Sequence, residues 1–200
     1  MLVPQTAGAP VPGVPSVVVP IPVEPSGPAP GPAERDVAAV TYAANPEKKG
    51  LDRVLAAWSA ARRPGEELWV CGTERFTDAP GVVRAGSLAP AEFRALLRRS
   101  RVYVTAPRRE DFGVAQLEAL ADGCVLVTTR SPGPYAALPL AAELDPRCVG
   151  DDLAGGLRAA LDDPVAGYAG RARELLAPFS RAAVDATVRD ELLPALLGSR

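Results

Sequence analysis

The sequence contains no histidine, few cysteines and no long apolar run, and each shortage excludes a class of protein. Without histidine there is no imidazole base and no histidine ligand for a metal. The cysteines are far apart and never form a CxxC pair, so a disulfide framework and a thiolate zinc site are both excluded. No stretch of about 18 apolar residues is present to span a membrane. The net charge of −2 provides no field that would attract nucleic acid or anionic lipid.

What remains is typical of a globular protein. Of the 200 residues, 48% are hydrophobic and 23% are charged. The apolar stretch near the start is not a signal peptide, because no Lys or Arg precedes Arg35 and prolines interrupt it repeatedly. Three unpaired cysteines fit a reducing compartment. We therefore expect a cytoplasmic protein.

Proline divides the chain into unequal parts. Ten of the 22 prolines fall within residues 1–34, where they prevent a helix or a central strand. We expect this segment to be an extended strap, with its apolar part (17–23) docked on protein and 26–33 as a flexible linker. Residues 35–180 are expected to form the folded domain and 181–200 a C-terminal helix.

From Arg35 onward, strand patterns alternate with helix patterns. Apolar runs predict strands, and apolar residues recurring at i, i+3, i+4 and i+7 predict helices. The expected strands are 37–43, 67–71, 81–84, 102–105 and 125–128; the expected helices begin at 51 and span 90–99 and 114–121, with mostly helix beyond 151. Strands separated by helices imply a doubly wound parallel α/β sheet of the Rossmann-like kind.

In such sheets, ligands bind beyond the carboxyl ends of the strands. The loops expected there are 44–50, 72–76, 107–113 and 130–135. If a helix begins near Gly113, its first N–H groups have no partner within the helix and can bind phosphate or sugar oxygens. Glu110 precedes this helix and Glu118 lies just over one turn inside it, where a partly desolvated carboxylate would accept hydrogen bonds from a diol. The alternative is that both acids only complement the helix N-terminus.

A second candidate segment is 45–52, which carries Lys48 and Lys49 between the first strand and its helix. A lysine here could reach phosphates held at the neighbouring helix start. The alternative is a solvated turn that happens to contain basic residues.

Together these segments resemble the donor-binding C-terminal domain of retaining GT-B glycosyltransferases of group 1. Glu110 through Glu118 matches the E-x7-E signature of that family. A Lys49-Gly50 turn, a V-x-x-x-G-x-L segment at 82–88 and the runs EDFG, LEALADG and VLVTT occur in the family's order. The resemblance covers roughly 37–180; residues 17–23 resemble the family's interdomain connector and those after 180 its C-terminal crossover helix.

The resemblance implies a role for each matching residue. Glu118 would hold the ribose hydroxyls of a nucleoside-diphosphate sugar and Glu110 would contact the donor sugar. Lys49, or in second place Lys48, would neutralise the pyrophosphate. The backbone of Phe112, Gly113 and Val114 would line the sugar and pyrophosphate, and 86–88, including Gly86 and Leu88, would lie against the base. The donor would be a hexose carried by a nucleotide, with neither a metal nor another cofactor.

The sequence also departs from the family pattern. The family has an arginine shortly before the pyrophosphate lysine, whereas this chain has Ala43, Ala44 and Asn45; Arg108 or Arg109 could substitute. The loop 130–135 lacks the family's usual glutamate. About 165 residues follow the strap, enough for the donor-binding half alone.

We therefore expect weak nucleotide-sugar binding and poor transfer by the isolated chain. A separate acceptor-domain polypeptide or a homodimer would supply the missing half, and a nucleotide-sugar-binding module without turnover is the alternative. Apolar residues at four-residue intervals near the C-terminus, with Pro194 expected to kink the last turn, would either form the interface or cap the same sheet. Their positions are Val184, Val188, Leu192 and Leu196.

Overall fold

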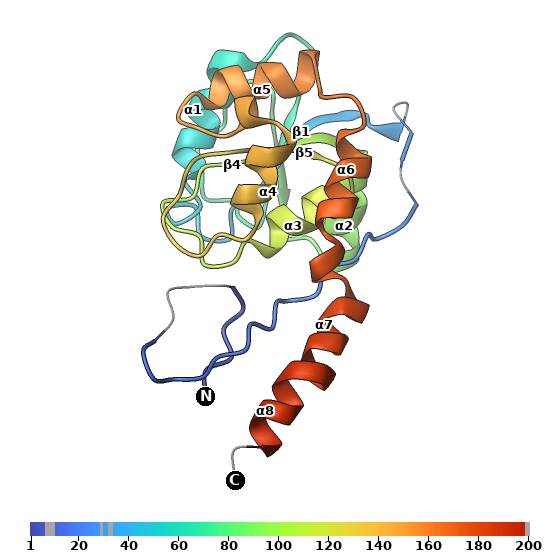
Figure 1. Cartoon of the computed structure of the whole chain (residues 1–200). Helices are drawn as coiled ribbons and strands as arrows, with labels where there is room; N and C mark the ends of the chain where they lie inside the picture. Colours follow the sequence, from blue (N-terminus) through green and yellow to red (C-terminus); the bar gives the residue numbers. More distant parts are fainter. Residues whose placement is uncertain (7–10, 29, 32–33, 199–200) are drawn as a thin grey trace.

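The fold is organised around one five-stranded, all-parallel sheet. A computed structural model describes residues 1–6, 11–28, 30–31 and 34–198. The strands lie in the order β3-β2-β1-β4-β5 (Figure 1). Their bounds are β1 Val37–Tyr42, β2 Leu68–Cys71, β3 Val82–Gly86, β4 Ser100–Thr105 and β5 Val125–Thr128. β1 is central, with Val40 paired to Trp69 of β2 on one side and to Tyr103 of β4 on the other. The predicted doubly wound α/β sheet is confirmed.

Helices cover both faces of this sheet. The helix α1 (Leu51–Ala61) packs with α5 (Leu153–Asp162) on one face, whereas α2 (Pro90–Arg99) packs with α3 (Val114–Ala121) on the other. The helix α6 (Tyr168–Leu175) lies against α3. This arrangement follows from the chain order, because all crossovers between parallel strands are right-handed. Crossovers that run in opposite directions along the sheet therefore place their helices on opposite faces.

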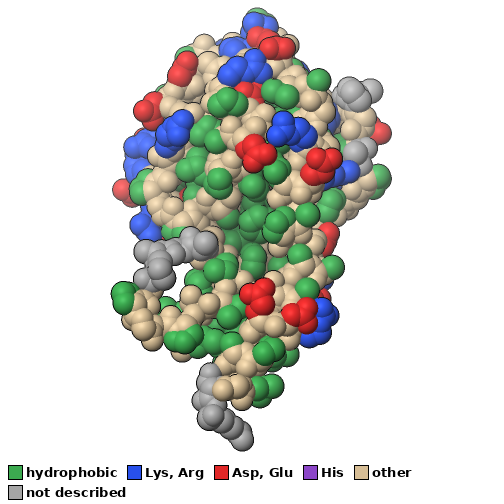
Figure 2. All heavy atoms as spheres, viewed as in Figure 1, with side chains coloured by type: hydrophobic (Ala, Val, Ile, Leu, Met, Phe, Trp, Pro, Cys, Tyr) green, Lys and Arg blue, Asp and Glu red, His purple; other side chains and the backbone are tan. Residues whose placement is uncertain are grey.

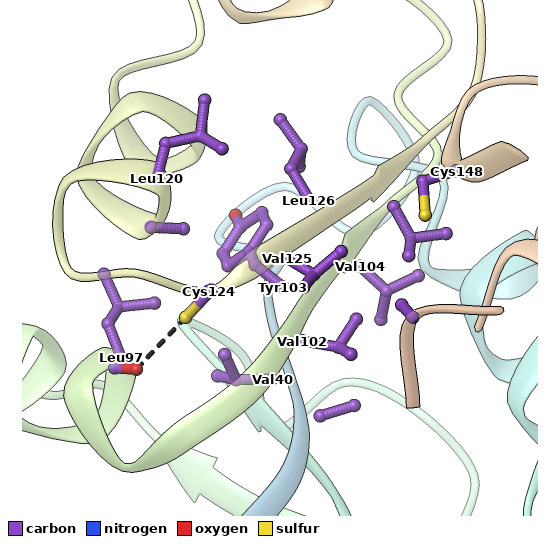
Figure 3. Packing of buried hydrophobic residues seen from close by; sticks show 14 of the residues in the cluster. Val40, Leu97, Val102, Tyr103, Val104, Leu120, Cys124, Val125, Leu126 and Cys148 are labelled. Carbon is purple, nitrogen blue, oxygen red and sulfur yellow. Dashed lines mark hydrogen bonds between the residues drawn. The ribbon is translucent and has the colours of Figure 1, made fainter. Parts of the chain in front are cut away.

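The core lies between these layers and is built mainly from β1, β4 and β5. In Figure 3, Val40 and Tyr103 lie on the side of the sheet that carries Leu97 of α2 and Leu120 of α3, whereas Val102 lies on the other side, and all five are buried. The thiol of Cys124 donates a hydrogen bond to the Leu97 carbonyl at 3.1 Å. All three cysteines are free and buried. Near-continuous burial explains why these strands read as apolar runs without alternation.

One helix was not predicted. Residues 137–144 form α4 (Ala137–Leu144), which packs on β5 and α6. The sequence analysis assigned no element to this segment, in which Pro139 occupies the first turn of α4. A proline there is compatible with a helix, because the N–H that it lacks would have no partner in the first turn.

The N-terminal strap is anchored to the domain at its apolar part, as predicted. Val23 is buried and its N–H donates to the Phe179 carbonyl at 2.8 Å. Nearer the start, the strap folds back on itself through a parallel bridge between Leu2 and Ser16. Within the expected linker, both the backbone N–H and the hydroxyl of Ser26 donate to Asp122. Residues 29, 32 and 33 of that linker lie outside the described part of the chain.

The C-terminal segment is one continuous helical rod that extends away from the domain (Figure 1). It comprises α7 (Arg181–Thr187), a π-helical turn (Val188–Leu192) and α8 (Leu193–Leu197). Pro194, where a kink was expected, follows this π turn, in which the Leu193 N–H donates to the Val188 carbonyl. A wider turn accommodates a proline that cannot donate to the fourth preceding carbonyl.

This rod is buried only at its beginning. Val184 is 5% exposed, whereas Leu196 and Leu197 are 53% and 73% exposed. Figure 2 shows hydrophobic side chains continuing from the domain onto the lower segment, with most charged groups on the upper part. Of the predicted four-residue apolar series, therefore, its first member packs on the domain and its last does not. None of the helices in the described residues has the length and apolar character needed to cross a membrane.

Candidate nucleotide-sugar site

Three loops at the carboxyl edge of the sheet are joined by backbone hydrogen bonds. The Arg108 N–H donates to the Lys48 carbonyl at 2.9 Å, which ties the β4–α3 loop to the β1–α1 loop. The Glu110 N–H donates to the Pro132 carbonyl at 3.1 Å, which ties it to the β5–α4 loop. Segments far apart in the sequence are thus held in one fixed cluster, as the strand order requires.

Two glycines permit this close approach. At Gly50, φ is +64° and an added Cβ would lie 1.9 Å from the Ala106 carbonyl oxygen. At Gly133, φ is +107° and an added Cβ would lie 2.2 Å from the Glu110 carbonyl oxygen. Both positions combine a left-handed backbone with a backbone neighbour that cannot move independently, so no other residue fits without strain.

Glu110 lies at the centre of the cluster, only 4% exposed. Its Oε2 accepts from Lys49 Nζ at 2.6 Å and from Gln116 Nε2 at 2.9 Å, and its Oε1 accepts from the Asp111 N–H at 3.1 Å. A carboxylate this deeply buried requires such donors to offset the loss of hydration. Gln116 was missed by the sequence analysis, although a glutamine between apolar residues of α3 was a signal of a buried polar contact.

Three other cations of these loops, Lys48, Arg108 and Arg109, form exposed ion pairs. Lys48 contacts Asp111 at 2.8 Å, and this pairing lowers the pKa of Asp111 and raises that of Lys48. Arg109 also pairs with Asp111, and Arg108 pairs with Asp52. Exposed pairs such as these exchange readily with water and contribute little stability.

The helix α3 begins directly beside Glu110. Gly113 is its N-cap, in the left-handed conformation and without a side-chain cap. Gly113 itself is buried, and a Cβ there would lie 2.8 Å from the Tyr135 ring. The following two residues, Val114 and Ala115, are half-buried. The first N–H groups of a helix have no partner within it, so this end offers donors and a positive dipole to an anion.

A cavity of about 350 Å³ opens between α2 and α3 beside this helix start. It is lined by Tyr42, Leu88, Pro90, Phe93, Val114, Ala115 and Glu118. The rings of Tyr42 and Phe93 pack with centroids 5.4 Å apart. Its walls are therefore mostly apolar and aromatic, with one carboxylate, which suits a flat ring joined to a polyol.

Glu118 provides that carboxylate. Its side chain is 26% exposed, and Arg94 of α2 contacts its Oε1 at 3.4 Å. Burial raises the pKa of Glu118 above its usual value, Arg94 opposes that rise and nearby Asp122 adds to it. The partly desolvated environment expected for Glu118 is confirmed.

No group of three or more Asp, Glu or Cys side chains in the described residues is arranged to hold a metal ion. The metal independence expected from the sequence stays a prediction.

Comparison with known proteins identifies the family. The family model described as glycosyl transferases group 1 matches residues 35–175. The chain belongs to this family. Glycogen synthase from Mycobacterium tuberculosis is 33% identical over 135 residues, a match that covers 60% of this chain and 32% of that enzyme. The chain thus spans about a third of the length of the curated relatives that it matches.

Solved structures share the fold of this glycosyltransferase chain. Sucrose-phosphate synthase from Thermosynechococcus elongatus superposes with a TM-score of 0.69 at 19% identity, covering 92% of this chain and 53% of that one. A structure described as the GtfA/B complex gives 0.69 at 14% identity, covering 92% and 41%. These neighbours are GT-B glycosyltransferases, and the chain has the fold of a C-terminal GT-B domain.

The glycosyltransferase domain brings its expected site residues together in two groups. Leu88, Val114 and Glu118 line one cavity, whereas Lys49 and Glu110 form a buried pair near the start of α3. The resemblance implies that both acids contact one donor, but only Glu118 lines this cavity and Glu110 does not. Instead, the Glu110 carboxylate accepts hydrogen bonds from Lys49 and Gln116.

The remaining expected residues contribute differently. Lys48 lies on the surface beside Asp111. Gly86 ends β3, and its carbonyl accepts from the Gly72 N–H. The ring of Phe112 packs edge-on against Phe179 with centroids 6.2 Å apart, and its carbonyl accepts from the Ala136 N–H. The contact between the Phe112 backbone and a ligand stays a prediction.

Proposed function

We propose that this chain is the donor-binding half of a retaining glycosyltransferase, which takes a hexose from a nucleoside-diphosphate sugar. The observation that carries the proposal is the cavity of about 350 Å³ with Glu118 in its wall and the first residues of α3 at its edge. It offers an apolar slot, a carboxylate for hydroxyls and a helix N-terminus for a diphosphate within a few residues of one another.

Each part of the donor has a partner in this proposal. The base lies along 86–88 and between apolar side chains, and Glu118 accepts hydrogen bonds from the ribose hydroxyls. The diphosphate meets the N–H groups at Gly113 and Val114 and the ammonium of Lys49. Glu110 contacts the sugar. Lys49 must therefore turn from Glu110 toward the phosphates, and Gln116 and the Asp111 N–H continue to hold Glu110 when it does.

The chemistry requires stabilisation of the leaving group. The bond between the anomeric carbon and the diphosphate oxygen breaks, and negative charge develops on the departing nucleoside diphosphate. A lysine and an uncapped helix start next to that charge stabilise it without a metal. Transfer is complete when an acceptor hydroxyl oxygen bonds to the anomeric carbon and loses its proton.

The acceptor site is proposed to come from outside these residues. The chain covers 41–53% of the two solved structures described above. An acceptor-domain polypeptide is the proposed partner, and a homodimer is the alternative. The exposed Leu193, Leu196 and Leu197 of the rod are the apolar surface available for it. Sedimentation at high concentration, with a search for co-purifying protein, tests this; a strictly monomeric chain without a partner would count against it.

We also propose a cytoplasmic location, supported by three free thiols in the described structure.

A binding module without turnover is the second candidate. It is favoured by the segment 43–45, where the family's arginine is replaced by Ala43, Ala44 and Asn45. The two arginines that could substitute are Arg108 and Arg109, and both already form ion pairs. A single lysine would then have to stabilise the whole diphosphate.

Titration with uridine, guanosine and adenosine diphosphates tests binding. We expect one of them to bind and to raise the unfolding temperature. Glu118→Gln should weaken it about tenfold, since a charged acceptor contributes roughly 1.5–3 kcal/mol to a hydrogen bond. The matched control is Glu143→Gln, which alters an exposed acid of α4. Absence of binding by all three nucleotides would refute the proposal.

Turnover separates the two candidates. The chain that binds a nucleotide is incubated with the corresponding radiolabelled nucleotide-sugar, and release of the nucleoside diphosphate is followed. A donor half should release it slowly alone and faster with an acceptor-domain partner. A binding module should retain the sugar-nucleotide intact under both conditions.

A further inference from the structure

Arg94 is connected to the candidate nucleoside cavity through Glu118, and no motif in the sequence indicated it. Its guanidinium has three partners: Nε donates to Asp122 Oδ2 at 2.6 Å, Nη1 lies 3.4 Å from Glu118 Oε1, and Nη2 donates to the Glu24 carbonyl at 2.7 Å. Arg94 lies on α2, and these partners belong to α3, its C-terminal cap and the N-terminal strap. The side chain is 17% exposed and thus largely removed from water.

The two acids that Arg94 contacts would otherwise repel each other. Glu118 and Asp122 are four residues apart at the end of α3, so they lie on the same side of the helix. Asp122 is 1% exposed, and a negative charge at a helix C-terminus is opposed by the helix dipole. The guanidinium of Arg94 lies between the two carboxylates and contacts both.

Arg94 is itself fixed by the strap. The Glu24 carbonyl accepts from one of its nitrogens, and Ser26 donates twice to the Asp122 Oδ1 at 2.8 and 2.9 Å. Asp122 Oδ1 is therefore held by the strap while its Oδ2 orients Arg94. A guanidinium held in this way has little freedom to move when Glu118 engages a ligand.

Glu118 is left with one oxygen available. Its Oε1 faces Arg94, and its Oε2 makes no hydrogen bond with any residue that the structure describes. Glu118 also lines the cavity with Leu88 and Val114. A carboxylate that is fixed through one oxygen and free at the other is prepared to accept a hydroxyl hydrogen bond.

We infer that Arg94 is a positioning residue for the nucleoside site: it holds Glu118 through Oε1 and leaves the other oxygen free at the cavity that Glu118 lines, using the docked strap segment 24–26 as its support. This inference rests on the proposed function, because it assigns Arg94 to the binding of the same nucleotide. It adds the requirement that a segment outside the nucleotide-binding loops contributes to affinity.

The test compares Arg94→Gln with a matched control, Arg158→Gln. Arg158 is also a helix arginine, 20% exposed, which bridges two carboxylates, Glu66 and Asp162, and a backbone carbonyl, but lies on the opposite face of the sheet. Each variant loses contacts with two carboxylates and one backbone carbonyl. A general loss of folding stability would therefore affect both variants alike. Affinity is measured by calorimetry in the full chain, with the nucleoside diphosphate that the wild type binds.

We expect Arg94→Gln to weaken binding about tenfold, equivalent to about 1.4 kcal/mol, and Arg158→Gln to leave affinity unchanged. Arg94→Lys keeps the positive charge but lacks the several N–H donors of the planar guanidinium, so it should bind the nucleotide with intermediate affinity. If Arg94→Gln does not fold, Arg94→Lys compared with Arg158→Lys replaces it. Equal affinity in the Arg94 and Arg158 variants would overturn the inference.

A pH profile distinguishes positioning from a structural role. The charged groups that face Glu118 are Arg94 from α2 and Asp122 from the end of α3. Removing Arg94 removes the influence that lowers the pKa of Glu118, so the pH below which binding is lost should move upward in Arg94→Gln. A merely destabilised protein would keep the wild-type profile.

One readout needs no ligand. The carboxyl carbon of Glu118, followed by NMR through a pH titration of the free chain, should titrate at higher pH in Arg94→Gln than in the wild type. If no nucleotide binds the wild type, the proposed function fails by itself, and this titration still decides whether Arg94 controls the charge of Glu118. An unchanged titration would refute that control.

Discussion

The pair formed by Lys49 and Glu110 offers the sharpest test of how the site is built. Lys49→Met removes the ammonium but keeps most of the side-chain length. The two groups are 2.6 Å apart, and their side chains are 20% and 6% exposed. Removing one partner of a buried ion pair typically costs about 3–5 kcal/mol, because the other charge stays buried without compensation.

The structure indicates the lower end of that range. Glu110 keeps two other donors, Gln116 Nε2 at 2.9 Å and the Asp111 N–H at 3.1 Å. We therefore expect Lys49→Met to lose about 3 kcal/mol of unfolding free energy. With a urea slope of about 2 kcal/mol/M, the unfolding midpoint should fall by about 1.5 M.

The neighbouring lysine provides the control. Lys48→Met removes an exposed pair with Asp111, in which the side chains are 43% and 54% exposed, and should leave the urea midpoint unchanged. Glu110→Gln combined with Lys49→Met should be less destabilising than the sum of the two single changes. A midpoint for Lys49→Met that matches the one for Lys48→Met, or additive effects in the double variant, would refute the reasoning.

Two further predictions concern the loops and the core. Gly133→Ala should cost about 3 kcal/mol, because it combines a φ of +107° with a clash against the Glu110 carbonyl, whereas Gly65→Ala, with a φ of +85° and open space, should cost about 1 kcal/mol; thermal unfolding measures both, and equal losses would contradict the clash. Burial raises the pKa of each cysteine thiol to about 12, so at pH 8 only about one folded thiol in ten thousand is ionised. The thiols should react with a disulfide reagent only on unfolding, and rapid reaction of the native chain at pH 8 would show that the core is open. The thiols concerned are Cys71, Cys124 and Cys148.

The elements that local pattern could predict are those whose apolar residues mark the packed face. The helices 90–99 and 114–121 and the strand 125–128 have the predicted bounds, because their apolar periodicity coincides with the face that packs. The strand 102–105 begins two residues earlier than predicted, at Ser100. The helix 137–144 was not predicted, and Pro139 stands in its first turn.

For the site, the sequence indicated the acids but not their partners. Glu118 was correctly expected to be partly desolvated, because it borders the apolar side of its helix. Its contact with Arg94 joins residues 24 positions apart, and the contact of Glu110 with Lys49 joins residues 61 apart. Nothing in either local pattern indicates which of the many arginines and lysines meets which acid.

By itself, the sequence determined the alternation of strands and helices, and with it the parallel sheet and the edge where the unusual residues collect. Periodicity and proline act within a few residues of the chain, so they could be interpreted without coordinates. Only the tertiary structure decided that Lys49 closes on Glu110, that the strap supports Arg94 and that Glu118 alone of the two acids lines the cavity. Those contacts depend on side-chain geometry between distant segments, and a few ångströms determine whether a charge is paired or left free for a ligand.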